Sequence, residues 1–317
     1  MNTRSEMLAR VLAIGFVLYV SATVLRRLDA GEGRSTAIET KSTSQSSEVM
    51  LNHFYIVLDG ETIRDLRTSE FLLGEFASVD TGLPRFTPAG DMSEILYVRG
   101  RSTYMELMGP KNGFGEPVGK CGIGLTVESR GEISKVERAL DRAFPGQAVS
   151  MLVDWSRDVD QPVHWYHLVH RVENAEHPNL FLWINEYHPD FFAWLDPTLD
   201  LSRLGITRAR FLHPRFRPMR LLDDVVSLTV ALPEPGRVAL GKQLGALGYS
   251  LVSDAADRLA WRGRDIRFDL VPVTDQRSGI ISIECRLTRR PEVAREFRFG
   301  PRSILRLRPD GTAAWSF

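Results

Sequence analysis

The sequence carries few of the local signatures that assign a chain to a familiar enzyme class. It has no glycine-rich phosphate-binding loop, no Gly-x-Ser-x-Gly turn and no His-Glu-x-x-His pattern. Only two cysteines occur among the 317 residues, Cys121 and Cys285, and no second metal ligand stands at a suitable spacing from either. Each lies in or beside an apolar stretch, so we interpret both as small buried side chains. Whether they pair is left open by the sequence.

An excess of charge of one sign is also missing, because 40 basic residues balance 40 acidic ones. This balance gives no general electrostatic attraction to nucleic acid, so we expect no nucleic-acid partner. Basic charge gathers in one place, where six arginines fall within residues 203–220 without any Asp or Glu. A phosphate or acidic-partner site is one interpretation. We favour an arginine-rich, solvated linker between repeats.

Residues 11–25 form the longest uncharged apolar run, with Arg10 before it and Arg26 and Arg27 after it. The run is short for a membrane-spanning helix, yet no convincing signal-peptide cleavage site follows it. We predict that residues 1–27 are an uncleaved hydrophobic anchor and that residues 28–49 are a flexible polar linker. The folded part would then be attached to a membrane. Basic residues on both sides of the run leave its orientation open, so the folded part could lie outside the cytoplasm. A start at Met50 would instead make the protein cytoplasmic.

Two distant stretches of the chain resemble each other, residues 96–108 and residues 259–271. Both read as a strand, an Arg-Gly-Arg turn and a second strand that carries one carboxylate at the same offset, Glu106 or Asp269. A strand and a helix are predicted upstream of each stretch. A strand–helix–strands unit that occurs more than once indicates an internally duplicated α+β protein.

A further copy of this pattern is predicted between the two, over residues 122–188, with its helix at 132–144. We therefore predict an α+β fold in which repeated βαβββ modules build curved mixed sheets that form a cup. The predicted units cover residues 50–110, 122–188 and 224–288. In terms of domains, residues 50–190 would hold paired βαβββ modules, 191–223 an aromatic and arginine-rich bridge, and 224–317 a third, degenerate unit followed by a C-terminal hairpin.

Glu106 and Glu186 are candidate functional residues because each is the single acid in an otherwise apolar final strand. Burying a carboxylate without a partner costs several kcal/mol, so it needs a cation, a proton or solvent. His53 opens the first strand of the first unit. If the sheets curve around a common cleft, the three side chains could bind a divalent cation, or one carboxyl could act as a general acid–base. The alternative is that both glutamates lie on solvated faces beside arginines such as Arg101.

Strand alternation gives the expected lining of such a cleft. Tyr104 would share a face with Glu106, and His188 a face with Glu186, with Tyr55 and Tyr166 completing the pocket. Three more histidines, at 164, 167 and 170, fall in one predicted strand. We interpret them as packed or rim residues rather than ligands.

His53 at the start of the first strand, Glu106 in the fourth and Glu186 at the end of a second βαβββ copy together resemble the vicinal oxygen chelate superfamily. That superfamily includes glyoxalase I, extradiol dioxygenases and bleomycin-resistance proteins, and residues 51–58 and 186–190 are most similar to a bacterial branch of glyoxalase-like proteins. The resemblance implies a cup of paired modules with metal ligands on first and last strands, here His53, Glu106 and Glu186. A fourth ligand would fall near Gly122, which has no side chain. In the third unit the matching positions are Ser227 and Asp269, which we expect to bind no metal.

Three functions remain open from the sequence. The first is a metal-dependent isomerase or lyase with Glu106 and Glu186 as catalytic groups. The second is a module that binds a small molecule without catalysis, and the third is an anchored interaction protein.

Overall fold

The computed structural model describes residues 48–80, 94–155, 161–172, 179–198, 206–255, 257–274 and 277–317. The anchor predicted for residues 1–27 and nearly all of the linker predicted for 28–49 lie outside these ranges. Among the helices within these ranges, none is long and apolar enough to cross a membrane.

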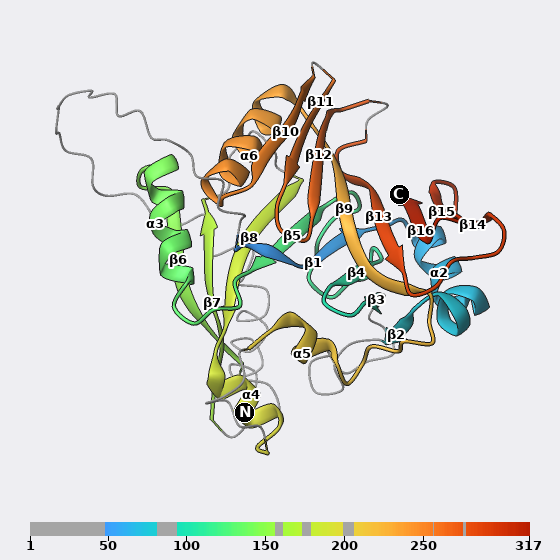
Figure 1. Ribbon diagram of the computed structural model, residues 1–317, viewed down its shortest axis with the longest axis horizontal. Coiled ribbons are helices and arrows are strands. Elements are labelled where there is room, and N and C mark those ends of the chain that lie inside the picture. Colours follow the sequence, from blue (N-terminus) through green and yellow to red (C-terminus); the bar gives the residue numbers. More distant parts are fainter. Residues whose placement is uncertain are drawn as a thin grey trace, which may run out of the picture. The chain divides into compact units, whose positions relative to one another are not determined.

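The first half of the chain forms one eight-stranded sheet from two βαβββ modules (Figure 1). Its strand order is β2-β3-β4-β1-β5-β8-β7-β6, and the antiparallel pairing of β1 with β5 joins the two modules. In each module the last strand runs parallel to the first, β4 beside β1 and β8 beside β5. The strands are β1 (Met50–Val57), β2 (Ser78–Asp80), β3 (Ile95–Arg99), β4 (Tyr104–Met108), β5 (Cys121–Thr126), β6 (Ala148–Trp155), β7 (Val163–Arg171) and β8 (Leu180–Tyr187).

The second half repeats this order as β10-β11-β12-β9-β13-β16-β15-β14, so the predicted fold class is confirmed. The prediction of its units needs correction, because β13 does not end the third module but begins a fourth. No helix follows β13 in the chain. A last strand parallel to β13 would need such a crossover helix, and β16 accordingly pairs with β13 in the antiparallel sense. The strands are β9 (Leu222–Leu232), β10 (Ser250–Ala255), β11 (Arg258–Arg262), β12 (Arg267–Pro272), β13 (Gly279–Leu287), β14 (Arg295–Phe299), β15 (Ser303–Leu307) and β16 (Thr312–Ser316).

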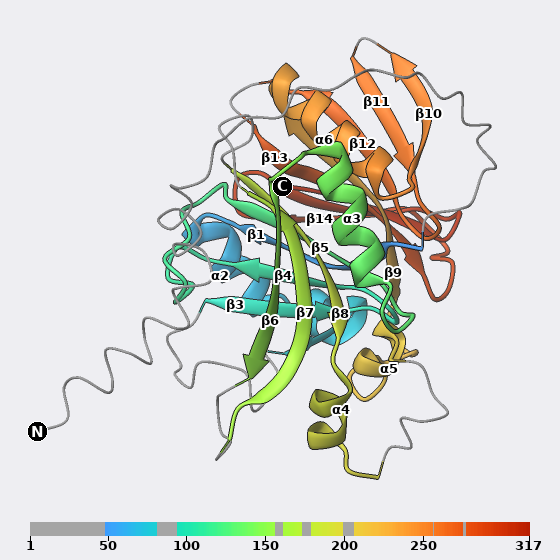
Figure 2. The ribbon, with the colours of Figure 1, turned by 90° about the vertical axis from the view of Figure 1, so that its left-hand side faces the viewer.

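The helices supply the crossovers and the bridge between the sheets. The crossover of the first module is α2 (Gly60–Thr68) followed by a π-helical turn, η2 (Leu72–Phe76), where the sequence predicted one continuous helix. The crossovers of the second and third modules are α3 (Ile133–Ala143) and α6 (Glu234–Ala246). Helix α3 contacts β6, β7 and β8, and it lies beside α6 in Figure 2. The bridge contains two short helices, α4 (Pro189–Leu195) and α5 (Arg208–Leu212).

The first Arg-Gly-Arg stretch, residues 99–101, lies in the hairpin turn between β3 and β4. A Cβ atom at Gly100 would lie 2.7 Å from the carbonyl oxygen of Asp223 and 2.9 Å from that of Thr103, so only glycine fits there. In the third module the equivalent Gly263 faces the ring of Tyr249, which a side chain would overlap. The two turns therefore repeat for a steric reason, close packing on a neighbouring segment.

The two faces of the first sheet differ in character. Alternate residues such as Phe54, Ile56 and Leu107 point into one large apolar core, which also takes side chains from the second sheet. The opposite face carries His53, Tyr55, Tyr104, Glu106, Trp183 and Tyr187, and part of it is covered by a separate aromatic cluster on α4 and α5. We call this side of the sheet the aromatic face.

Candidate functional site

Two of the predicted site residues, His53 and Glu106, meet on the aromatic face. Parallel pairing of β1 with β4 sets His53 opposite Tyr104 and Tyr55 opposite Glu106. The His53 Nε2 atom lies 3.8 Å from Glu106 Oε1, and each side chain is 15% exposed. The imidazole stacks on Tyr104, with ring centroids 4.5 Å apart, and meets the edge of Trp183 at 5.2 Å. The pair is thus enclosed by rings but still reaches solvent.

A β-bulge orients the imidazole. The β1–β5 register skips one residue between Leu51 and His53, and that extra residue is Asn52, which is buried. Its Nδ2 group donates to the hydroxyl of Tyr187 at 3.1 Å, and its Oδ1 atom lies 3.0 Å from His53 Nδ1. Because an amide oxygen only accepts, His53 carries its hydrogen on Nδ1 and turns the lone pair of Nε2 toward Glu106.

Burial shifts the protonation of the two groups in opposite senses. It raises the pKa of Glu106 to about 7, although the nearby charge of Arg99 opposes the shift. Burial lowers the pKa of His53 to about 3, and the charge of Arg99 adds to this shift. At neutral pH the imidazole is therefore neutral, whereas Glu106 exists in both protonated and ionised forms.

Arg99 is held in place as a fixed positive charge beside the site. Its guanidinium group pairs with Asp80 at 3.0 Å and lies over the rings of Tyr97 and Tyr104, at 4.6 and 4.7 Å from their centroids. Neither Arg99 nor Asn52 was predicted from the sequence as a site residue. The available signal for Asn52 was a second polar residue next to His53 in an otherwise apolar strand.

Glu186 is not part of this site. Along β8, Trp183 and Tyr187 point to the aromatic face, so Glu186 points to the other side, toward α3. Its carboxylate accepts hydrogen bonds from the backbone N–H groups of Gly131 at 2.7 Å and Ile133 at 3.0 Å. Glu186 therefore stabilises the start of α3, and the predicted convergence of His53, Glu106 and Glu186 is not observed.

The residues present do not fit a divalent metal ion. In the second module the positions opposite Tyr55 and His53 are Gly122 and Gly124. A side chain at Gly122 would overlap the ring of Tyr55, and a Cβ atom at Gly124 would lie 2.8 Å from Trp183 and 2.9 Å from His53. Rings thus fill the space where ligands from the second module would stand. Across the described ranges, no group of three or more His, Cys, Asp or Glu side chains is placed to hold a metal.

The predicted pocket residues divide between two places. Tyr55 and Tyr104 line the aromatic face. Tyr166 on β7 pairs with Tyr187 on β8. Burial raises the pKa of Tyr166, and the nearby charge of Glu106 adds to this shift, so Tyr166 lies close to the site. His188 does not join them, because its Nδ1 atom caps α4 by accepting from the Asp190 N–H at 3.3 Å. Its ring meets that of His164, which binds Asp154 at 2.6 Å.

In the third unit, the two matching positions contact each other and two arginines. Asp269 is buried and pairs with Arg258 and Arg267, at 2.8 and 2.9 Å, and these arginines lower its pKa against the effect of burial. Ser227 Oγ lies 3.5 Å from the same carboxylate. The carboxylate is engaged in ion pairs within its own sheet.

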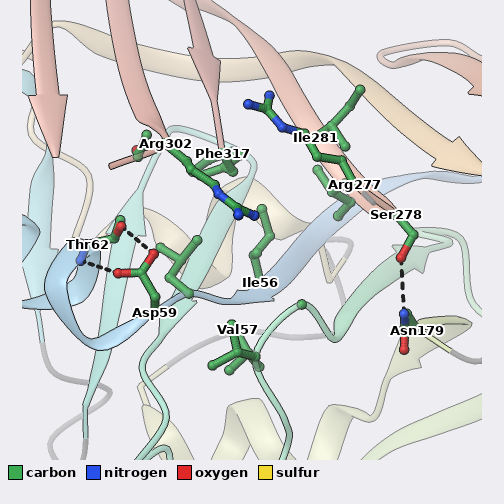
Figure 3. A pocket seen from close by; sticks show the side chains of 15 residues that line it. Ile56, Val57, Asp59, Thr62, Asn179, Arg277, Ser278, Ile281, Arg302 and Phe317 are labelled. Atoms are coloured by element: carbon green, nitrogen blue, oxygen red, sulfur yellow. Dashed lines mark hydrogen bonds between the residues drawn. The ribbon is translucent and has the colours of Figure 1, made fainter. Parts of the chain in front are cut away.

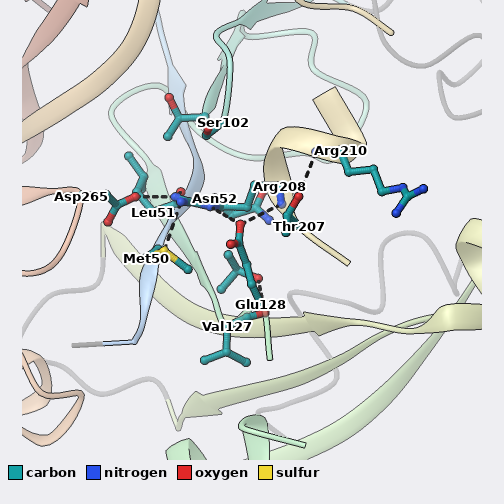
Figure 4. A network of polar contacts seen from close by, with 12 residues as sticks. Met50, Leu51, Asn52, Ser102, Val127, Glu128, Thr207, Arg208, Arg210 and Asp265 are labelled. Carbon is teal, nitrogen blue, oxygen red and sulfur yellow. Dashed lines mark hydrogen bonds and ion pairs between the residues drawn. The ribbon is translucent and has the colours of Figure 1, made fainter. Parts of the chain in front are cut away.

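Arg208, from the arginine-rich bridge, binds the backbone beside the bulge (Figure 4). This buried guanidinium group donates to the carbonyl of Leu51, next to the bulge, and to the carboxylates of Glu128 and Asp265. From the same helix, Phe211 packs against Tyr104 and Tyr187, with centroids 6.4 and 5.2 Å apart. The solvated linker favoured from the sequence therefore includes a buried arginine that joins three parts of the fold.

Together, the described strands and helices define an α+β protein built from paired βαβββ modules. The chain belongs to the family described as "Family of unknown function (DUF5829)", whose model matches residues 51–317. No curated protein matches the chain.

Several solved structures are similar to this chain at low identity. A hypothetical protein from Staphylococcus aureus is 11% identical with a TM-score of 0.46, and the match covers 79% of this chain and 95% of that one. A halotolerant catechol dioxygenase is 8% identical with a TM-score of 0.37, over 75% of this chain and 67% of that one. A variant of 4-hydroxymandelate synthase from Streptomyces coelicolor is 13% identical with a TM-score of 0.34, over 72% and 63%.

Proposed function

We propose that this protein binds a small aromatic or otherwise planar molecule on the aromatic face, with Glu106 as the polar group that recognises it. The observation that carries the proposal is the His53–Glu106 pair, 3.8 Å apart and partly exposed among aromatic rings. Sites for small molecules typically combine apolar rings with a few placed polar groups, as here.

The two polar groups suit a ligand with both a donor and an acceptor. Protonated Glu106 can donate a hydrogen bond and ionised Glu106 can accept one, because its pKa is raised to about 7. Neutral His53 offers the Nε2 lone pair as an acceptor, since Asn52 engages Nδ1. The partly exposed rings of Tyr97, Tyr166 and Phe181 would supply stacking surface around them.

The raised pKa of Glu106 also supports a second candidate, an isomerase or lyase that works by proton transfer. A carboxylate with a pKa near neutrality can take a proton from a carbon next to a carbonyl group and return it to another atom of the same substrate. His53 would accept a hydrogen bond from the substrate during this transfer. Neither step involves Glu186.

Ligand-observed NMR with a panel of small aromatic acids, phenols and amides tests the binding proposal. We expect hits on the wild-type protein that weaken at least about tenfold in His53→Ala and Glu106→Ala, the loss expected when a charged or buried hydrogen bond is removed. Glu137→Ala, on α3 and away from the aromatic face, is the matched control and should bind normally. Equal binding by all four proteins would contradict the proposal.

Metal analysis of protein purified without chelators provides an independent check. We expect less than one equivalent of any divalent metal, because the second module supplies no ligand at Gly122 or Gly124. One equivalent in the wild type that disappears in His53→Ala would establish a metal site and favour a metal-dependent enzyme.

We also propose that residues 1–27 anchor the protein to a membrane, on the basis of the apolar run between Arg10 and Arg26. Fractionation after gentle lysis tests this, because an anchored protein sediments with membranes and requires detergent for release. Full-length protein that stays in the supernatant would contradict the anchor.

A further inference from the structure

A second feature lies where the two sheets meet, apart from the aromatic face. The C-terminal end of β1 and the chain around Gly119 and Asn179 face β13 and the start of β15, and between them lies a half-open cavity of about 220 Å³ (Figure 3). Its wall includes Ile56 and Ile281. Ile56 lies on the opposite side of β1 from His53, because neighbouring strand residues alternate between faces.

The carboxylate in the lining of this cavity already accepts several hydrogen bonds. Asp59, the carboxylate in the lining, caps α2 by accepting from the N–H groups of Glu61 and Thr62, and its second oxygen accepts from the Thr62 hydroxyl at 2.8 Å. These hydrogen bonds lower its pKa, so Asp59 is ionised at neutral pH and its charge is balanced by the helix start.

Several donors of the cavity, in contrast, remain available. Ser278 Oγ accepts from Asn179 at 3.1 Å, and Ser303 Oγ accepts from the indole of Trp315 at 2.8 Å, so each hydroxyl keeps its own hydrogen for another partner. Ser303 is buried, and a buried hydroxyl hydrogen without an acceptor is costly.

Two arginines complete this set of donors. The guanidinium groups of Arg277 and Arg302 border the cavity, and within the described part of the chain neither makes a hydrogen bond or an ion pair. Figure 3 shows the side chain of Arg302 extending toward Ile56. Most other arginines of the same sheet do have acidic partners, among them Arg295 with Glu75 and Arg308 with Glu284. Arg277 and Arg302 thus bring two guanidinium groups without an acidic partner among the described residues to the lining of one cavity.

We propose that the cavity binds a small organic acid anion. The carboxylate would be held by Arg302 and Arg277, with the hydroxyls of Ser278 and Ser303 as additional donors, and a short hydrocarbon body would lie against Ile56 and Ile281. A volume of 220 Å³ is below the roughly 300 Å³ at which sites for drug-sized ligands begin, so the body has only a few carbon atoms. Paired guanidinium groups match the planar, two-oxygen geometry of a carboxylate.

Isothermal titration calorimetry on the full chain at constant ionic strength tests this site, with sodium isobutyrate, isobutyramide and inorganic phosphate as probes. We expect isobutyrate to bind the wild type, and binding to weaken at least about tenfold in Arg302→Gln, as for loss of one charge-assisted hydrogen bond. Arg302→Lys should retain part of the affinity. Arg262→Gln removes an exposed arginine outside the cavity and should leave binding unchanged.

Three results would overturn the proposal. Isobutyramide binding as well as isobutyrate would show that the carboxylate charge is not recognised. Unchanged isobutyrate affinity in Arg302→Gln would place any binding elsewhere on the molecule. Binding of phosphate alone, or of no probe, would exclude an organic acid as the ligand of this cavity. None of these results depends on what binds at the aromatic face.

Discussion

At the scale of single residues, the site contains two largely buried titratable groups, Glu106 and His53. Their shifted pKa values change the free energy of unfolding with pH in opposite directions. The folded pKa of Glu106 is raised from 4.5 to about 7, so its protonation favours the folded state. That contribution is fully present below pH 4.5 and is lost as pH rises through 7. The folded pKa of His53 is lowered from 6.5 to about 3, so its contribution is present above 6.5 and is lost as pH falls toward 3. Between 4.5 and 6.5 the two effects oppose each other.

Glu106→Gln separates the two effects, because glutamine keeps the shape of the side chain but cannot ionise. We expect the unfolding free energy of the variant to equal that of the wild type below about pH 4 and to exceed it by about 3 kcal/mol above about pH 8, because the pKa of Glu106 is raised from 4.5 to about 7 on folding. Urea unfolding over this pH range measures the difference. A difference that does not change with pH would mean that Glu106 ionises normally in the folded protein.

Gly124 sets the shape of the aromatic face, since its missing side chain makes room for the rings of Trp183 and His53. We expect Gly124→Ala to lower the unfolding free energy by about 1–3 kcal/mol, as overpacking of a filled site does, and to abolish ligand binding there. Gly74→Ala is the matched control, because a Cβ atom at Gly74 has open space around it. Equal stability of the two variants in urea unfolding would contradict this steric role.

At the scale of elements, the sequence was sufficient for most strands and for the order strand, helix, strands, because apolar periodicity and turn residues are local signals. It was not sufficient for the fourth module, which has no helix and so gives no strand–helix–strands pattern. The His53–Glu106 contact could be predicted because first and last strands of a module are neighbours. Glu186 could not be placed correctly, because a one-residue difference in where a strand begins reverses the face of every side chain. The bulge at Asn52 and the contacts of Arg208 depend on tertiary packing.

The role of Glu186 is therefore tested through the helix that it caps, α3. Glu186→Ala leaves the N–H groups of Gly131 and Ile133 without their acceptor, and α3 has no side-chain cap at Glu132 to replace it. We expect a loss of about 1–2 kcal/mol in unfolding free energy, as for removal of a helix cap, with ligand binding at the aromatic face unchanged. Glu137→Ala on the same helix controls for the loss of charge. If Glu186→Ala lost ligand binding but kept normal stability, Glu186 would be a residue of the binding site rather than a helix cap.

At the scale of the whole folded part, residues 48–317, each module of one sheet packs on a module of the other. Helix α3 of the second module contacts α6 of the third. The crossover of the first module packs on the fourth module, where Phe71 stacks on Phe297 at 3.6 Å and Phe76 meets Trp315 at 5.8 Å. The fourth module, which lacks a crossover of its own, is covered by that of the first. The turn between β3 and β4 is also tied to Asp224, which accepts from the Thr103 N–H at 2.9 Å.

This packing leads to a prediction about residues 48–190 produced alone. The predicted domain of paired modules covers nearly the same residues, yet its core residues share one apolar cluster with the second sheet. The fragment would expose Phe71, Phe76 and the core face of β1, and would lose the contact between Arg208 and the bulge. Because exposed apolar surface of this extent promotes association, we expect the fragment to aggregate or to unfold without a cooperative transition. The full chain should give a single transition for the folded part in calorimetry. A monomeric fragment with a sharp transition of its own would show that the first sheet is an independent domain, and that the aromatic face needs neither the bridge nor the second sheet to form.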